Sequence, residues 1–162
     1  MKARGVNILG IVSAILMFVS LILPWWTLTV EGGYGAGTTS FFLIGPSPSL
    51  PANSAIFAIW LALGLVVVSG ISSLVGSVKV GARSALLWGG ILAALSLVTF
   101  AIGLQVFISG VFLRVSLFYS GPFDGGYTAS AYLSFGFWLA LVAVIMAIAA
   151  YRRSPHSGTP DP

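Results

Sequence analysis

The sequence predicts an all-α membrane protein, built as a four-helix up-down-up-down bundle with a small extracellular antiparallel β-sheet formed by its two outer loops. Of the 162 residues, 58% are hydrophobic and only 6% are charged, whereas soluble domains carry about 25% charged residues. Four apolar runs each reach the length of about 20 residues that a membrane-spanning helix needs. Most basic residues lie at the ends of these runs, where topology signals are found.

The first predicted span covers residues 6–26 and follows a short basic start. The run is longer than the hydrophobic region of about 7–15 residues in a cleaved signal peptide, and no small-residue cleavage site follows it. We therefore expect a retained helix that Pro24 ends or kinks. Trp25 and Trp26 would then lie at the level of the lipid headgroups, where indole rings are enriched.

The first outer loop, residues 27–51, begins with a strand pattern. Apolar and polar residues alternate from Trp26 to Glu31, which is typical of a strand. Glycines dominate residues 32–37, and residues 38–44 are rich in β-branched and aromatic side chains. The loop is therefore expected to form a β-hairpin.

The other three spans are expected at residues 52–78, 84–108 and 131–151, with a short basic turn between the second and the third. With the first span they make one domain, residues 1–151. The polar, proline-rich residues 152–162 are expected to form a disordered cytoplasmic tail.

The second outer loop, residues 109–130, contains an alternating stretch from Val111 to Tyr119. This stretch predicts either a strand or a continuation of the third helix beyond the membrane. A strand here would pair with the first hairpin in a small antiparallel sheet. Arg114 would then be within reach of Glu31 or Asp124.

The basic residues predict the orientation in the membrane. Four spans put both termini and the basic turn on one side. That side carries six of the seven basic residues: Lys2, Arg4, Lys79, Arg83, Arg152 and Arg153. The positive-inside rule therefore predicts a multi-pass protein of the cell membrane with both termini in the cytoplasm and both long loops outside.

Small residues are expected to hold the helices together, because lipid tails are as apolar as leucine and close packing must drive association. Pairs of small residues four positions apart occur in every span and are expected to face the bundle interior. They include Gly10/Ala14, Ser69/Ser73, Gly89/Ala93 and Gly136/Ala140.

The residue types within the spans argue against an enzyme. The span centres hold no ionisable residue, the chain has no cysteine, and its one histidine is His156 in the tail. No cofactor or metal is therefore expected. The few basic residues are not clustered on one face as nucleic-acid binding requires. Gln105 is the strongly polar side chain within a helix, and we expect it to hydrogen-bond across helices.

Two short motifs resemble the claudins and related peripheral-myelin-protein-like tetraspans. Leu23-Pro24-Trp25-Trp26 is similar to the end of their first helix, and the second loop resembles theirs in order through Arg114, Phe118-Tyr119, Pro122, Asp124 and Ala131-Tyr132-Leu133. The Gly-Leu-Trp motif and the two first-loop cysteines of claudins are missing here. The resemblance implies a left-handed bundle under an outer sheet, with a role in adhesion, barrier formation or assembly.

We therefore expect a non-enzymatic structural or interaction protein that is surrounded by membrane lipid and associates with further copies or other membrane proteins through its outer loops. An accessory subunit of a respiratory or transport complex is the main alternative, and a channel or transporter is the third. The residues expected to carry the interaction are Pro24, Trp25, Trp26, Glu31, Phe41, Phe42, Arg114, Phe118, Tyr119 and Asp124.

Overall fold

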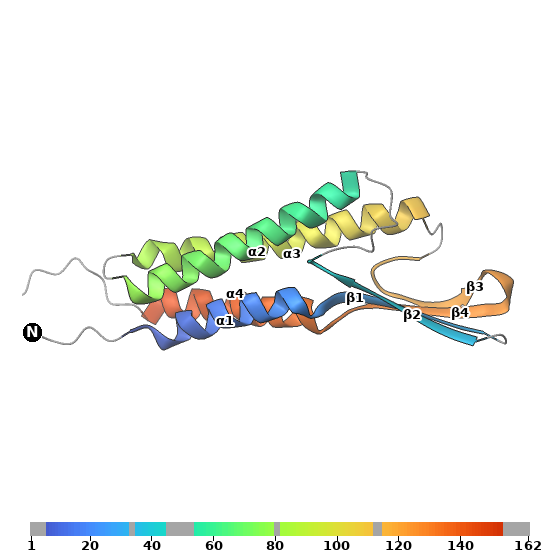
Figure 1. The fold of residues 1–162 in the computed structure, drawn as a ribbon, viewed down its shortest axis with the longest axis horizontal. Helices are drawn as coiled ribbons and strands as arrows, with labels where there is room; N and C mark the ends of the chain where they lie inside the picture. The colour runs from blue at the N-terminus through green and yellow to red at the C-terminus, as the bar shows by residue number, and fades with distance from the viewer. Residues whose placement is uncertain (1–5, 33–34, 45–53, 80–81, 112–114, 154–162) are drawn as a thin grey trace, which may run out of the picture.

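The computed structural model describes residues 6–32, 35–44, 54–79, 82–111 and 115–153. In these residues four α-helices form a bundle, and an antiparallel four-stranded sheet extends from one end of it (Figure 1). In chain order the elements are α1 (Ile8–Ile22), β1 (Pro24–Gly32), β2 (Gly35–Phe42), α2 (Ser54–Val78), α3 (Arg83–Val111), β3 (Tyr119–Phe123), the short 3-10 helix η1 (Asp124–Gly126), β4 (Tyr127–Leu133) and α4 (Phe135–Arg153).

Three of the helices, α2, α3 and α4, are long and apolar enough to cross a membrane. Helix α1 has only 15 residues, which at about 1.5 Å per residue makes it ~22 Å long. The hydrocarbon core of a bilayer is about 30 Å thick. The prediction of apolar membrane helices joined to a small antiparallel sheet is thus confirmed, and a crossing by α1 stays a prediction.

The predicted first span is wrong over residues 23–26, which are not helical, while the prediction that Pro24 ends the helix is confirmed. Helix α1 ends at Ile22, and Leu23 has the extended backbone angles φ −98° and ψ 151°. The ring of Pro24 disfavours helical angles in the residue before it, and proline has no backbone N–H to donate. The chain therefore turns directly from helix into strand β1.

The predicted fourth span is wrong at its start. Residues 131–133 belong to strand β4, and α4 begins at Phe135. Ser134 lies between the two elements, and its carbonyl accepts the first hydrogen bond of the helix, from the backbone N–H of Phe137 at 3.1 Å. The second and third spans agree with α2 and α3 within three residues at each end.

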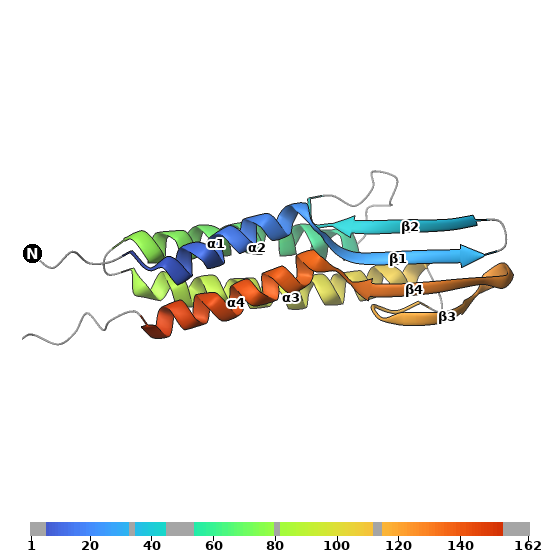
Figure 2. The same cartoon turned by 90° about the horizontal axis from the view of Figure 1, so that it is seen from below.

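The sheet has the strand order β2-β1-β4-β3, and all its neighbours are antiparallel. The predicted hairpin is confirmed as β1 and β2, which are in register from Thr29 opposite Thr38 to Gly32 opposite Gly35. On its other side β1 pairs with β4, where Leu28 lies opposite Ala131. One sheet therefore joins the segment that follows α1 to the segment that precedes α4 (Figure 2).

The strand expected between Val111 and Tyr119 is misplaced. Helix α3 continues to Val111, residues 115–118 are not in a strand, and residues 112–114 lie outside the described part of the chain. The strands of this half of the sheet are β3 and β4 instead. Strand β4 buries Ala129, Ala131 and Leu133 on one face, so its alternation reflects a half-buried strand.

The helices pack as a ring in which α1 contacts α2 and α4, and α3 contacts α2 and α4. Small residues lie at these contacts, as predicted. A side chain on Gly89 would collide with the Ser73 hydroxyl of α2 and approach the Ser69 carbonyl to 3.1 Å. A side chain on Gly10 would collide with Ser77 and approach Leu86 Cδ2 to 2.7 Å. Hydroxyls also join the helices, since Ser69 donates to the Gly89 carbonyl at 2.5 Å.

Candidate interaction surface

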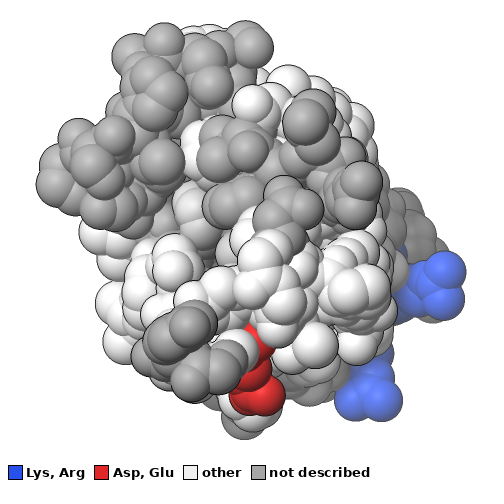
Figure 3. Space-filling model, turned by 90° about the vertical axis from the view of Figure 1, so that its right-hand side faces the viewer, with Lys and Arg blue, Asp and Glu red and all other residues white. Residues whose placement is uncertain are grey.

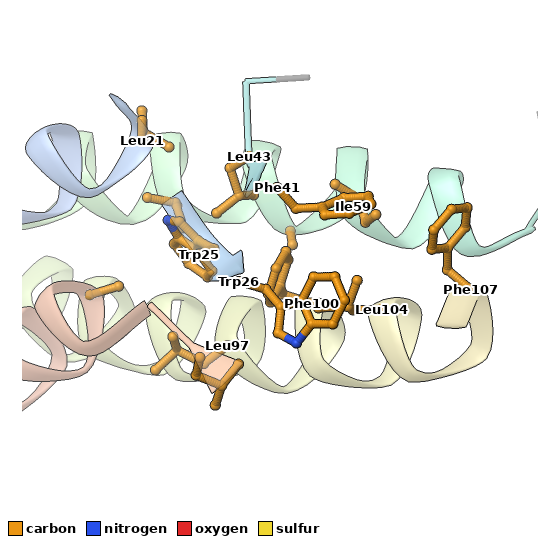
Figure 4. Packing of buried hydrophobic residues seen from close by; sticks show 14 of the residues in the cluster. Leu21, Trp25, Trp26, Phe41, Leu43, Ile59, Leu97, Phe100, Leu104 and Phe107 are labelled. Carbon is orange, nitrogen blue, oxygen red and sulfur yellow. The ribbon is translucent and has the colours of Figure 1, made fainter. Parts of the chain in front are cut away.

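The junction between bundle and sheet is built around Trp25, which is fully buried. Its ring meets Phe100 of α3 edge-on at 5.0 Å between centroids and Phe137 of α4 at 5.8 Å. Its indole N–H donates to the Ser20 carbonyl at 2.8 Å, which satisfies a carbonyl in the last turn of α1. Three helices and the first strand are thereby fixed to one another through one side chain (Figure 4).

One face of the sheet is apolar and is covered by the outer end of α3. Trp26 is fully buried and packs against Phe41 at 5.3 Å, and Phe41 packs against Phe107 of α3 at 5.7 Å. The Trp26 indole N–H donates to the Leu117 carbonyl at 3.0 Å. The segment after α3 is therefore held against this face, and the buried side chains of the sheet continue the core of the bundle.

The opposite face of the sheet is rich in hydroxyl groups, and we call it the hydroxyl face. Side chains alternate along each strand, and residues paired in register share a face. The residues of the hydroxyl face therefore lie side by side across all four strands. They are Thr27, Thr29 and Glu31 on β1, Thr38 and Ser40 on β2, Thr128 and Ser130 on β4, and Ser120 on β3.

The hydroxyl face is buried at Thr27 of β1 and exposed on β2 and at Thr128 of β4. The Thr27 hydroxyl is buried and pairs with the Ser134 hydroxyl at 2.6 Å. Thr38, Ser40 and Thr128 are exposed. Exposed hydroxyl groups hydrogen-bond to water. The polar groups of a partner can replace that water with little change in free energy.

An open groove of 280 Å³ lies on the hydroxyl face near its far end. Thr29, Glu31, Ser120, Gly121, Thr128, Ala129 and Ser130 line it. Figure 3 looks onto this end of the molecule, where most of the described surface is uncharged and acidic side chains lie near one edge. The groove therefore presents hydroxyl groups and one exposed carboxylate, that of Glu31, as hydrogen-bonding groups.

The side chains that line the groove decide what it can bind. A hydroxyl nucleophile needs an adjacent base, such as histidine, to activate it, and the groove is lined by Ser and Thr with one glutamate. The described residues contain no group of three or more His, Cys, Asp or Glu that could hold a metal ion. What the groove offers is hydrogen bonding and one negative charge.

The sheet brings some of the predicted interaction residues together and separates others. Trp25, Trp26 and Phe41 are buried in the core, so they do not form part of an outer aromatic surface as expected. The headgroup level expected for Trp25 and Trp26 stays a prediction. Pro24 starts β1 opposite Phe42, which is 38% exposed. The remaining residues divide as follows: Glu31 and Phe118 are exposed, Tyr119 is half-buried, Arg114 lies outside the described residues, and only the backbone of Asp124 is described.

The expected contact of Arg114 with Glu31 or Asp124 thus stays a prediction. The expected role of Gln105 is wrong. Its side-chain oxygen accepts from the Leu117 backbone N–H at 3.2 Å, and its amide donates to Ser109 one turn along α3 at 3.2 Å. Gln105 therefore holds the segment after α3 and does not bridge helices.

The hydroxyl face itself is the feature that the sequence analysis missed. Its signal is present in the chain as three short Thr/Ser alternations, Thr27–Thr29, Thr38–Ser40 and Thr128–Ser130. The first two lie in predicted strands. The third lies in the predicted second loop, outside any predicted strand, so the continuity of the face across β1 and β4 is not visible in the sequence.

A scan against protein-family models finds no family that matches this chain, and a search of curated proteins finds no similar sequence. The case for a function therefore comes from the arrangement of the described residues alone.

Proposed function

We propose that this protein is a multi-pass, claudin-like membrane protein that acts through its outer sheet in adhesion or in the assembly of membrane proteins. The observation that carries the proposal is the sheet. It extends from one end of an apolar bundle, is fixed to that bundle through Trp25 and Trp26, and leaves a polar face uncovered. A rigid platform with an open hydrogen-bonding face is suited to binding another macromolecule.

The orientation that we propose places the sheet outside the cell and the termini in the cytoplasm. It is supported by the basic residues at the opposite end of the bundle. Arg83 at the start of α3 donates to the Tyr151 carbonyl of α4 at 3.0 Å and stacks over the Tyr151 ring at 4.4 Å. Lys79, Arg152 and Arg153 lie at helix ends on the same side, as the positive-inside rule requires of a cytoplasmic surface.

The helix surfaces support a role for lipid as the surrounding solvent. Large apolar side chains are exposed along every helix, with Ile15, Trp60, Trp88 and Ile145 at 53%, 50%, 59% and 60% exposure. In water, apolar exposure on this scale would drive aggregation. In a bilayer these side chains contact acyl chains, and the bundle is held by its buried small residues.

A photocrosslinking scan in native membranes tests the proposal. A photoreactive amino acid replaces one exposed residue at a time, at Thr38 and Thr128 on the sheet and at Ile91 and Val98 on the helices. We expect protein adducts from the sheet positions and only lipid adducts from the helix positions. No protein adduct from either sheet position would contradict the proposal.

The same scan distinguishes the proposed function from the main alternative. An accessory subunit of a larger membrane complex would be embedded through its helices. Adducts from Ile91 or Val98 to other membrane proteins, at fixed stoichiometry and with the sheet positions silent, would favour that function over the one proposed here.

A further inference from the structure

The two edges of the sheet differ in how they are protected. Among the described residues, β2 pairs with β1 on one side only, and its other side is an edge. It has eight residues, and all but Phe41 are exposed. It carries no charge and no proline. An uncharged, proline-free edge presents unpaired backbone groups as a template for another strand.

The other edge, β3, is blunted. It has only five residues. Pro122 has no N–H to donate, and its carbonyl already accepts the Tyr119 hydroxyl at 2.6 Å. Short length and proline are two of the devices that natural sheets use to prevent edge-to-edge association. Within the described part of the chain, one edge is thus protected and the other is left open.

The direction of β2 decides which partner fits. Both β1 and β2 run along the long axis of the bundle (Figures 1 and 2), which is the membrane normal in the proposed orientation. Two copies related by a two-fold axis along that normal would present β2 strands that run the same way. The N–H groups of each copy would then face their own counterparts, so no hydrogen-bond ladder would close.

Copies in two facing membranes meet differently. Their β2 strands run in opposite directions, and a two-fold axis perpendicular to the sheet closes an antiparallel ladder. The hydroxyl faces then lie on the same side, so that Thr38 and Ser40 of one copy neighbour the same residues of the other. Cross-strand threonine and serine pairs of this kind are favourable, and no charge on β2 opposes the contact.

We infer that the open edge of β2 pairs antiparallel with β2 of a second copy in a facing membrane, an inference that rests on the proposed function. The pairing joins two four-stranded sheets into one of eight strands. The two-fold axis places residues of the same face opposite each other, so at most seven of the eight residues of β2 overlap. At about 3.3 Å per residue this overlap extends over ~23 Å.

Vesicle tethering with a charge exchange tests the inference. The full-length protein is reconstituted into two liposome populations labelled with donor and acceptor lipids, and tethering is followed by energy transfer. The wild-type protein should tether the two populations. Thr38→Lys/Ser40→Lys in both populations should abolish tethering, as should Thr38→Glu/Ser40→Glu in both, since like charges would lie opposite each other. Lysine vesicles mixed with glutamate vesicles should tether again.

A matched control carries the same added charge away from the open edge. Ser109→Lys/Gly110→Lys alters two exposed positions at the end of α3, where nothing lies within 4 Å of a side chain on Gly110, and should tether like the wild type. Circular dichroism and gel filtration confirm folding of each variant, and Thr38→Lys alone serves where the double variant misfolds. Absence of wild-type tethering, tethering by lysine vesicles alone, or no restoration on mixing would each overturn the inference.

The photocrosslinking scan distinguishes this failure from failure of the proposed function. Sheet adducts within a single membrane, without any tethering, would be consistent with the proposed function. They would contradict only the pairing of β2 across two membranes. Absence of both the sheet adducts and the tethering would contradict the inference and the proposed function together.

Discussion

Gly136, near the start of α4, reports on the junction between bundle and sheet. A methyl group there would collide with Trp25 Cδ1 and lie 2.8 Å from both the Leu23 carbonyl and Trp25 Nε1. The Leu23 carbonyl is backbone, and Trp25 is fully buried among the aromatic rings of α3 and α4. Neither can move without displacing the start of β1.

Gly136→Ala should therefore destabilise the protein by about 1–3 kcal/mol, the usual cost of overpacking a well-packed core. The matched control is Gly64→Ala in α2, where nothing lies within 4 Å of the added methyl group. Alanine is the better helix former by up to about 1 kcal/mol, so this control should be neutral or stabilising. The two variants should then differ by roughly 1–4 kcal/mol.

The free energy of unfolding is measured in mixed micelles by raising the mole fraction of a denaturing detergent, with tryptophan fluorescence as the signal. Both variants are glycine-to-alanine changes in helices, so their intrinsic chemistry is the same and only the packing differs. Equal stability of the two variants would show that α4 does not pack against Trp25 as described.

Two further predictions concern buried polar groups. Trp25→Phe removes the shorter of the two hydrogen bonds to the Ser20 carbonyl, which keeps the Leu23 backbone N–H at 3.4 Å. The change should therefore cost about 0.5–1.5 kcal/mol in the same unfolding assay, the net contribution of one hydrogen bond. A loss no larger than that of Trp138→Phe, whose indole is 49% exposed, would count against the Trp25 hydrogen bond. Ser73→Ala should be neutral or stabilising, because the buried Ser73 hydroxyl has no hydrogen-bond partner, whereas Ser69→Ala should cost about 1 kcal/mol by removing its bond to Gly89. The opposite ranking of the two serine variants would refute the packing of α2 on α3.

Much of the architecture is readable from the sequence because it depends on local composition. Apolar length predicts α2 and α3 within three residues, and the alternation from Trp26 to Glu31 predicts β1. Small residues at four-residue spacing predict the helix contacts, since lipid offers no competing driving force and only close packing remains.

The errors share a physical cause, which is pairing between distant segments. Residues 131–133 look like the start of an apolar span, but their alternation with 127–130 is satisfied by pairing with β1, about one hundred residues earlier. Trp25 and Trp26 have the composition of a membrane-interface belt. They are buried because distant segments enclose them: Phe100 of α3 and Phe137 of α4 pack against Trp25, and Phe41 of β2 packs against Trp26. Neither fact is visible in a local window.

Substituted-cysteine labelling tests most directly whether the sheet and the basic helix ends lie on opposite sides of a membrane. The chain has no cysteine of its own, so Thr38→Cys on β2 and Lys79→Cys after α2 each provide one accessible thiol. With a membrane-impermeant maleimide on intact cells, the account predicts labelling of Thr38→Cys at once and of Lys79→Cys only after the membrane is permeabilised. Labelling of Lys79→Cys in intact cells, with Thr38→Cys protected, would contradict it.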